Sequence, residues 1–482
     1  MSMNVPRIFV ASEFYRELEC ALPGKVLAPN SVGYETQQAS YYSAEQSALL
    51  PFCRVAPTET KDVAETVRAL TARGISFAVR SGGHMAWKGA SNIGPEGVTI
   101  DLQHLNHVVL SEDKKTVSVG PGCTWHDVYT VLQPHGLAVV GGRSSGVGVG
   151  GFLMGGGISF LSLQHGLGSD NVVNYEAVLA DGSVVNANMG TNSDLHWALK
   201  LGSTNFAIVT RFDLVTFPLA EMWGGGQIYD ISMAELLVDN LESVTRKLVE
   251  DPTVMTAVCL AYVSAQSQYA IWVPTICLKP IAFPPILSKL KNLNPIMNTL
   301  RCTNLINLTD EVHTTAPRTP GGRVIWFTLT LKLDSQLPLE LFEAGKELFE
   351  PFLKLAGFEW SIIVQPLNVG IIEASQSKSG GNPFGLITED GDRLLFLGSV
   401  SWSNSADDGI CAAKVTEYLR LTESIARSRN LLDKFLYMNY ANGGQKVYEG
   451  IGNDNYNRMK AIQKVYDPDS LFHCCWKGGF KL

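Results

Sequence analysis

Two glycine-rich segments and one histidine give this chain its clearest chemical signal. His84 directly follows Gly82 and Gly83 in the segment Val79–Gly89, VRSGGHMAWKG, after an expected strand. The segment Gly141–Gly157, GGRSSGVGVGGFLMGGG, carries no charge beyond Arg143. Glycine this dense costs backbone entropy, but it lets N–H groups approach a phosphate or the edge of a flat polar ring. The two segments together indicate a large nucleotide cofactor held by backbone, with one reactive side chain beside it.

A short aromatic segment near the C-terminus is the second candidate for chemistry. Tyr437, Asn439 and Tyr440 lie in FLYMNY, which we expect to form a short strand. Alternation along a strand would place Tyr437 and Asn439 on one face and Tyr440 on the other. These rings can simply pack in a half-buried layer. For a tyrosine to act as a base at neutral pH, a nearby cation or hydrogen-bond donor must lower its pKa from about 10.

The elements that position these residues fall into three stretches of sequence. From about residue 45 to 218 we expect a helix over TKDVAETVRALTARG, a strand at ISFAVR, a helix over TWHDVYTVLQPHG and a hairpin at Asp181-Gly182. From about 220 to 430, long strands alternate with amphipathic helices, which indicates one sheet covered by helices. The remaining tail contains an expected helix, NYNRMKAIQKVYD, and ends in WKGGFKL. A chain of 482 residues is long enough for two or three domains.

Composition excludes several classes of protein. The chain is 45% hydrophobic and 17% charged, as expected of a globular protein with a large core. Its formal net charge of −8 argues against nucleic acid or an anionic membrane as the main partner. No apolar run is long enough to span a bilayer, and the N-terminus lacks the pattern of a signal peptide. A cytoplasmic location is therefore the default expectation.

Cysteine and histidine spacing predicts no metal site. The nine cysteines include no CxxC pair, which argues against zinc or a redox dithiol. Cys20 and Cys53 flank one N-terminal module and are candidates for a disulfide bridge. His104 and His107 have the spacing HxxH but no third ligand nearby, so we interpret them as turn residues.

An ordered set of motifs resembles a known family. RSGGH, VGVGG with the following GGG, GLGSDNV, GSTNFAIVTRFDL, and YMNY with the later YDPDSLF are similar to segments of the berberine-bridge-enzyme-like FAD-linked oxidases. This family belongs to the vanillyl-alcohol-oxidase superfamily, and the fungal branch is the most similar. The resemblance implies an α+β fold with a PCMH-type, two-subdomain FAD-binding domain over 1–219. It further implies an inserted substrate domain of antiparallel sheet and helices over 220–430, and a segment 431–482 that returns to the FAD-binding domain.

The same resemblance assigns the cofactor and its contacts. It implies FAD joined through the His84 ring to the 8α-methyl carbon of the flavin. The turn Arg80–His84 and Ala90 would wrap the pyrophosphate, and Val209 would contact the flavin through its backbone. Some relatives carry a second link from a cysteine, but Ser144 occupies that position here, so a single covalent bond is predicted. The full set of implied cofactor residues is Arg80, Ser81, Gly82, Gly83, His84, Ala90, Gly141, Gly142, Ser144, Ser145, Val147, Gly148, Gly151, Met154, Gly155, Gly156, Gly157, Asp170, Asn171, Val209 and Asn439.

The resemblance also implies a reaction. A substrate C–H bond would give a hydride to FAD while Tyr437 or Tyr440, assisted by Asn439, takes a proton from a neighbouring O–H or N–H. Electrons would then pass to O2 and yield H2O2, and the small Val147 would suit access of oxygen. The glutamate base of some relatives has no clear counterpart. Gln365 and Trp326 lie on expected strands that face either the flavin or the core.

Several alternatives stay open at this stage. The same scaffold hosts redox-neutral isomerases or cyclases, carbohydrate oxidases, and flavoproteins that only bind a ligand. Apolar, proline-rich segments such as PTICLKPIAFPPILSKL favour a hydrophobic, natural-product-like substrate over a sugar. Many related fungal proteins are secreted, in contrast to the default location given above. The expected partners are a small-molecule substrate and O2, and no sequence feature sets an oligomeric state.

Overall fold

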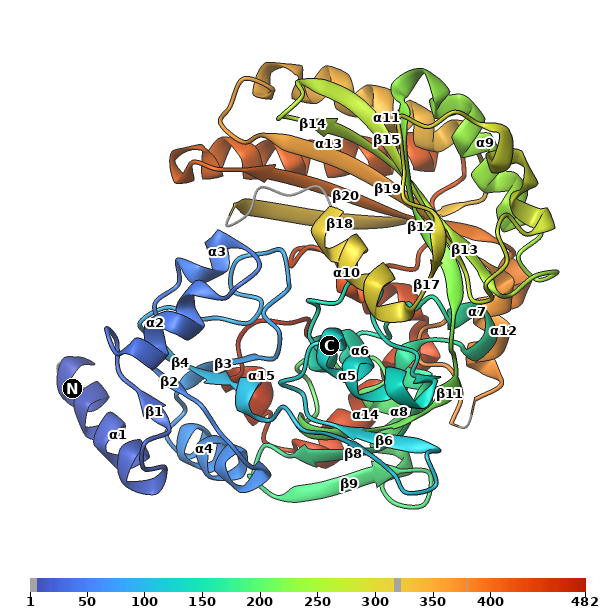
Figure 1. Ribbon diagram of the computed structural model, residues 1–482. Helices are drawn as coiled ribbons and strands as arrows, with labels where there is room; N and C mark the ends of the chain where they lie inside the picture. The colour runs from blue at the N-terminus through green and yellow to red at the C-terminus, as the bar shows by residue number, and fades with distance from the viewer. Residues whose placement is uncertain (1–6, 316–321, 379) are drawn as a thin grey trace.

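The computed structural model describes residues 7–315, 322–378 and 380–482 (Figure 1). The strands of these residues form a four-stranded, a five-stranded and a nine-stranded sheet and one two-stranded pair. The N-terminal sheet has the strand order β1-β2-β4-β3, with β2 and β3 both parallel to β4. The parallel pairs need crossover connections, and helix α4 supplies the one between β2 and β3. The elements of this layer are α1 (Arg7–Ala21), β1 (Val26–Leu27), α2 (Val32–Ala39), α3 (Ala44–Ser47), β2 (Cys53–Val55), α4 (Thr60–Ala72), β3 (Ser76–Arg80) and β4 (Gly97–Asp101).

Local sequence explains where helix α4 begins and ends. Glu59 and Asp62 form a capping box at its N-terminus, which satisfies backbone N–H groups that have no partner within the helix. After the helix, Gly74 adopts φ +63°, a conformation that glycine reaches without steric cost. The predicted helix over TKDVAETVRALTARG and the strand at ISFAVR are both confirmed.

A five-stranded antiparallel sheet follows, in the order β5-β6-β10-β8-β9. The predicted hairpin is present, with β8 paired to β9 across Asp181-Gly182. The predicted helix over TWHDVYTVLQPHG is shorter than expected, because its last turn before Gly136 is a 3-10 turn. The elements are β5 (Val108–Leu110), β6 (Thr116–Val119), α5 (Trp125–Leu132), β7 (Leu137–Ala138), α6 (Val149–Met154), α7 (Ser162–His165), β8 (Val172–Val178), β9 (Val184–Asn188), α8 (Ser193–Leu199), β10 (Ile208–Val215) and β11 (Phe217–Pro218), the last paired with β7.

The largest sheet is antiparallel and has nine strands. Its main path runs β16-β12-β15-β14-β19-β20-β18, with β13 paired to β15 and β17 to β12. The strands predicted from residues 220 to 430 thus belong to one sheet, as expected. They are β12 (Met222–Asp230), β13 (Val254–Thr256), β14 (Val258–Val263), β15 (Gln268–Cys277), β16 (Met297–Asn298), β17 (Arg301–Thr303), β18 (Arg323–Lys332), β19 (Glu359–Leu367) and β20 (Arg393–Trp402).

Helices cover the two faces of this sheet unequally. α9 (Ala234–Thr245), α11 (Gln336–Phe349) and α13 (Asp408–Ser428) pack on the face that points away from the other sheets (Figure 1). α10 (Leu305–Thr315) lies on the opposite side and contacts α5. α12 (Val369–Gln376) packs against α7. The face opposite α9, α11 and α13 is therefore turned toward the glycine-rich segments.

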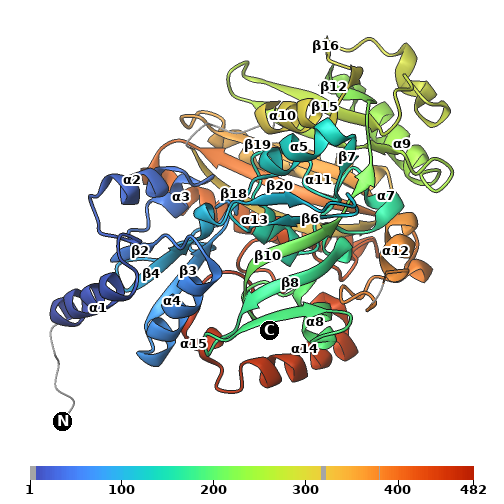
Figure 2. The ribbon, with the colours of Figure 1, turned by 60° about the horizontal axis from the view of Figure 1, so that its bottom comes forward.

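The C-terminal segment returns to the first half of the chain (Figure 2). α14 (Asn453–Tyr466) contacts α8, and α15 (Leu471–Cys475) contacts α4 and β3. One hydrophobic cluster fills the N-terminal layer, and a larger one runs through the five-stranded and nine-stranded sheets.

Two sequence expectations about cysteines and membranes can be tested here. All nine cysteines are free thiols, so the suggested Cys20–Cys53 bridge is not formed. Cys20 is exposed on α1, whereas Cys53 lies fully buried on β2. Among the described residues, no helix is both long and apolar enough to cross a bilayer.

Candidate active site

A large cavity lies between the glycine-rich segments and the uncovered face of the nine-stranded sheet. One wall comes from residues 79–91, 142–160 and 203–212. The sheet supplies the facing wall, and the segments 437–440 and 476–480 complete the cavity. Residues more than 350 positions apart in sequence therefore share one site.

Glycines let the first wall form because backbones approach closely there. A Cβ on Gly82 would lie 2.6 Å from the backbone N and Cα of Gly148, which leaves no room for a side chain. Gly141 and Gly142 lie against the Trp125 ring in the same way. Gly151 differs, because it lines the cavity and a Cβ there would meet nothing within 4 Å. The wall is therefore backbone-built and leaves open space on its cavity side.

His84 lies on this wall in an aromatic setting. Its ring stacks on Tyr42 with centroids 4.0 Å apart and an interplanar angle of 22°. The Trp326 ring lies 6.1 Å from it and the His313 ring 6.4 Å. Gly83, with φ +63°, turns the chain just before His84. The turn thus places the His84 imidazole among the residues that line the cavity.

The segment expected to be a strand at FLYMNY is instead a turn. Met438–Tyr440 form the 3-10 turn η9, so strand alternation does not apply and that prediction was wrong. Tyr437, Asn439 and Tyr440 all line the cavity. The rings of Tyr437 and Tyr440 meet edge to face, with centroids 4.9 Å apart. The tight turn brings together side chains that a strand would separate.

Arg143 links this turn to the sheet. Its guanidinium donates hydrogen bonds of 2.6 Å to the Tyr440 hydroxyl and 2.6 Å to Gln365 Oε1. Gln365 Nε2 lies 3.4 Å from the same hydroxyl. No described carboxylate forms an ion pair with Arg143. A charged donor at this position makes a stronger hydrogen bond to the Tyr440 oxygen than a neutral donor would.

Tyr437 has a different environment from Tyr440. Its hydroxyl accepts hydrogen bonds from the Ile158 backbone N–H at 2.8 Å and from Asn439 Nδ2 at 3.2 Å. Only 3% of Tyr437 is exposed. Burial raises the pKa of Tyr437, and the nearby Tyr440 adds to this, while Arg143 opposes it more weakly. Tyr437 is therefore held as a neutral phenol that fixes the turn against the glycine segment.

The sheet wall is mostly apolar. Trp272, Pro274 and Ile276 alternate along β15, and their side chains therefore share one face of the pleat. Ile363 and Gln365 have the same relation on β19. Met255, Ala257, Trp326 and Leu397 complete the wall. Among the described lining residues there is no aspartate, glutamate, lysine or cysteine.

Helix α10 closes one side of the site. The Thr309 carbonyl accepts a hydrogen bond from the Ser145 N–H at 3.1 Å, which ties the helix to the glycine segment. His313 then reaches the cavity, and its Nδ1 lies 3.2 Å from Ser144 Oγ. A Cβ on Gly146 would overlap the His313 ring, so glycine is needed at this contact.

The structure divides the sequence-predicted residues into two groups. Those that line the cavity are Ser81, Gly82, Gly83, His84, Ala90, Gly142, Ser144, Val147, Gly148, Gly151, Met154, Val209, Tyr437, Asn439 and Tyr440. Those that lie behind the wall are Arg80, Gly141, Ser145, Gly155, Gly156, Gly157, Asp170 and Asn171. Trp326 and Gln365, which the sequence left between flavin and core, both reach the cavity.

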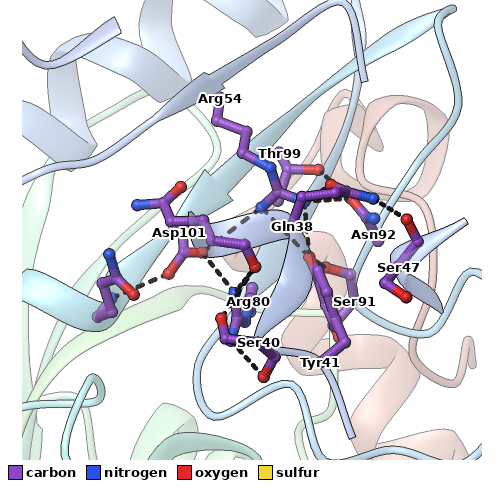
Figure 3. A network of polar contacts seen from close by, with 12 residues as sticks. Gln38, Ser40, Tyr41, Ser47, Arg54, Arg80, Ser91, Asn92, Thr99 and Asp101 are labelled. Carbon is purple, nitrogen blue, oxygen red and sulfur yellow. Dashed lines mark hydrogen bonds and ion pairs between the residues drawn. The ribbon is translucent and has the colours of Figure 1, made fainter. Parts of the chain in front are cut away.

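Residues of the second group make contacts that support the wall. Arg80 points into a buried polar network with Asp101 and Ser40 (Figure 3), and it is not among the residues that line the cavity. Asp170 pairs with Lys200 at 3.2 Å, and both side chains are fully buried. Asn171 donates to the carbonyls of His165 and Leu167. Gly155 packs against Asn439.

Sequence reasoning missed several residues of the site. Arg143 carried a usable signal, because it is the one charge in a glycine-dense run. Tyr42, Trp272 and His313 carried none, because they lie in ordinary-looking segments that only the fold brings to the cavity. His104 and His107 stay outside it, and no group of metal-ligating side chains occurs among the described residues.

Comparison with protein families and solved structures is consistent with this geometry. Residues 51–188 match the model of an FAD binding domain. The chain is 34% identical over 475 residues to FAD-dependent monooxygenase drtC of Aspergillus calidoustus, covering 96% of this chain and 89% of that protein.

Two solved structures share the fold at low sequence identity. The 6-hydroxy-D-nicotine oxidase of Arthrobacter nicotinovorans aligns with a TM-score of 0.77 and 20% identity, covering 94% of this chain and 97% of that one. The berberine bridge enzyme of Eschscholzia californica aligns with a TM-score of 0.73 and 17% identity, covering 96% and 97%. The expected α+β architecture is therefore confirmed over nearly the whole chain.

Proposed function

The chain belongs to the berberine-bridge-enzyme-like FAD-linked oxidoreductases, and from that premise we propose that it is an oxidase of a small, hydrophobic hydroxyl compound, with O2 as electron acceptor. The observation that carries this proposal is the hydrogen bond from Arg143 to the Tyr440 hydroxyl on the cavity wall. In this proposal, residues 1–219 and 431–482 bind the cofactor, and residues 220–430 supply the substrate wall.

The residues present fit FAD. The backbone of Ser81–His84 and of Val147–Gly151 would hold it, because glycine leaves N–H groups accessible and Gly151 faces open space. We assign a single covalent link to His84. The absence of cysteine from the described cavity wall, with Ser144 beside His313, supports one link rather than two. Mass analysis of flavin-bearing peptides tests this assignment, and flavin on a peptide without His84 would refute it.

When bound, FAD supplies a hydride acceptor and a route for two electrons to O2. Tyr440 is the group we assign as the base. Arg143 and Gln365 direct N–H groups at its oxygen, which hold that oxygen on the cavity wall where a substrate hydroxyl could pass a proton to it. Tyr437 accepts hydrogen bonds from neutral donors and has a raised pKa, so it positions the turn instead. The substrate loses a C–H hydride and an O–H proton and becomes a carbonyl compound.

The walls of the cavity define the class of substrate. A protonated amine would face Arg143 with no described carboxylate on the lining to compensate its charge, which makes its burial costly. A sugar would lose hydrogen bonds to water that an apolar sheet wall does not replace. A hydrophobic compound with a hydroxyl beside the reacting carbon satisfies both the wall and Tyr440.

Anaerobic mixing of the purified protein with alcohols, phenols, sugars and amines tests the proposal. A hydrophobic hydroxyl compound should bleach the flavin absorbance, and air should restore it with one H2O2 formed per O2 consumed. Substrate conversion without O2 uptake would instead identify the redox-neutral isomerase or cyclase. Bleaching by sugars alone would favour a carbohydrate oxidase.

Monooxygenation is a second candidate, because the relative from A. calidoustus carries that name. This reaction places one atom of O2 in the product and the other in water, and it consumes two further electrons from an external reductant. Isotopically labelled O2 separates the two reactions. Label in the product would support monooxygenation, and label only in H2O2 would support the oxidase.

A further inference from the structure

A buried polar network lies behind the turn that precedes His84 (Figure 3). Its charged members are Arg54, Arg80 and Asp101, and the Asp101 carboxylate pairs with Arg80 at 3.0 Å and Arg54 at 3.5 Å. The side chains of Arg54 and Asp101 are 0% exposed and that of Arg80 is 5% exposed. Two guanidiniums thus share one carboxylate, and at least one positive charge is buried without a counter-ion.

The other partners in this network are neutral. Arg54 donates to the side chain of Asn92 at 3.2 Å and also to Gln38. Arg80 donates to the carbonyls of Gln37 and Ser40. The Nε atoms of both arginines are buried without a hydrogen-bond partner among the described residues. These contacts orient the guanidiniums but do not neutralise the surplus charge.

The network lies directly beneath the cavity wall. Arg80 ends strand β3 and begins the turn Ser81–His84. Its Nε lies 2.8 Å from the position that a Cβ on Gly83 would occupy, so the guanidinium supports this turn from behind. The surplus charge therefore lies one layer below the backbone N–H groups that we assign to the cofactor.

A second unpaired cation flanks the same end of the cavity. The Lys481 ammonium donates to the carbonyls of Thr204 at 2.7 Å and Phe472 at 3.1 Å, and no described carboxylate forms an ion pair with it. Burial lowers the pKa of Lys481 to about 7, and the charge of Lys477 contributes to this shift. The ammonium also lies 5.6 Å from the centroid of the Trp476 ring. A half-buried lysine that has carbonyls and an aromatic ring as partners, and no carboxylate, is costly to keep charged.

The C-terminal segment fixes Lys481 beside the cavity. Gly479 N–H donates to the Ala90 carbonyl, and Phe480 N–H donates to Ser203 Oγ at 2.8 Å. The Gly478 carbonyl accepts a hydrogen bond from Thr204 Oγ1. Gly479 and Phe480 themselves line the cavity, as do Ala90 and Thr204. The network reaches the same segment, because the Tyr41 hydroxyl, which Arg54 contacts at 3.4 Å, donates to the Ser91 carbonyl next to Ala90.

We propose that the buried arginine network and the half-buried Lys481 act together as a remote counter-charge that selects a diphosphate-bearing flavin over an uncharged one. This inference rests on the proposed function. Once Lys481 is protonated, the two surplus positive charges match the two negative charges of a diphosphate, and a low-dielectric surrounding extends their effect beyond direct contact. Arg54, Arg80 and Lys481 are positioning residues here, because backbone groups make the contacts.

A flavin-binding titration tests the proposal without turnover. Full-length protein with His84→Ala should bind flavin reversibly because it lacks the assigned covalent link, and fluorescence quenching would then give the affinities for FAD and for riboflavin. Lys481→Met should weaken FAD by about tenfold and change riboflavin by less than about twofold, because only FAD carries the diphosphate. Lys464→Met, which removes an exposed charge on α14, is the matched control and should change neither affinity appreciably.

The arginine network supplies a second, independent arm. Arg54→Met should lower the ratio of FAD to riboflavin affinity, whereas Arg54→Lys keeps the charge and should preserve that ratio even if the protein is less stable. Equal weakening of both flavins in Lys481→Met and Arg54→Met would show a purely structural role and overturn the inference. Failure of the His84→Ala parent to bind either flavin would overturn the proposed function, and this inference with it.

Discussion

The two walls of the cavity are built in different ways. The wall that carries His84 consists mainly of backbone, and its glycines allow chain segments to approach within van der Waals distance. The wall on the nine-stranded sheet consists of side chains such as Trp272, Ile276 and Ile363, set by the alternation of the strands. Arg143 belongs to the first wall and reaches Gln365 on the second. The backbone wall suits a constant, large cofactor, and the side-chain wall can vary with the substrate.

The largest expected effect separates two glycines of the backbone wall. Gly82→Ala should abolish flavin binding and destabilise the fold by several kcal/mol, because its Cβ would meet the Gly148 backbone at 2.6 Å. Gly151→Ala is the matched control, because its Cβ meets nothing. This second variant should keep or raise the melting temperature, since alanine favours helix α6, while flavin content falls.

Calorimetry measures the stability of both variants, and the ratio of flavin to protein absorbance measures their flavin content. Equal losses of stability in the two alanine variants would contradict the interpretation that the Gly148 backbone excludes a side chain at Gly82. Retained flavin in Gly82→Ala would contradict it directly.

Substitution of Tyr440 and of Tyr437 tests which tyrosine of the turn between the two walls acts as the base. Tyr440→Phe should slow anaerobic flavin reduction by about 10²–10⁴-fold, the usual contribution of a positioned base, with flavin content unchanged. Tyr437→Phe should cost about 1–3 kcal/mol of stability, because the buried Ile158 N–H loses its acceptor, and leave the reduction rate within about tenfold. The reverse pattern would make Tyr437 the base.

Arg143→Met should have a smaller effect on the same rate. Tyr440 keeps its hydroxyl but loses its charged donor, so we expect flavin reduction to be about 10–100-fold slower. Arg143→Lys restores a cation without the fork that reaches both Tyr440 and Gln365, and should recover part of the rate. An unchanged rate of flavin reduction in Arg143→Met would show that the arginine does not assist the tyrosine.

The contrast between the walls also explains what sequence alone could predict. Gly82 and Gly148, with His84 close to Gly82, could be predicted from the sequence as residues of the cavity wall. A backbone that requires glycine leaves a local pattern of glycines. The long strands β18, β19 and β20 were identifiable from hydrophobic runs. The 3-10 turn at Met438–Tyr440 was not, because an aromatic segment bounded by polar residues fits a strand equally well and packing against Ile158 decides the outcome.

Residues that act through distant partners were the hardest to identify. Arg80 resembles a cofactor ligand by position, yet its guanidinium turns inward because Asp101 and Gln37 offer buried acceptors. Asp170 likewise follows a glycine motif but pairs with Lys200. His313 comes to the site only because α10 docks on the glycine segment through Thr309. No local pattern encodes such long-range pairings.

The smallest expected effect is a pH dependence at the nucleotide end of the backbone wall. Burial holds the pKa of Lys481 near 7 in the flavin-free protein, where Lys477 lowers it and Asp467 raises it. Lys460, on α14, also brings a positive charge close to Lys481, because its ammonium contacts the main-chain oxygen of the adjacent Leu482. A diphosphate favours the charged ammonium, so binding takes up a proton. FAD affinity is then highest below pH 7 and falls as pH rises through about 7.

Titrations of the His84→Ala protein between about pH 6 and pH 8.5 measure this dependence. A rise of one unit in the Lys481 pKa on binding corresponds to a loss of at most about tenfold in affinity over that range. Riboflavin should show no such trend, and Lys481→Met should remove it for FAD. If FAD affinity still falls with rising pH in Lys481→Met, the proton is taken up by another group. Lys481 is then not the titrating counter-charge.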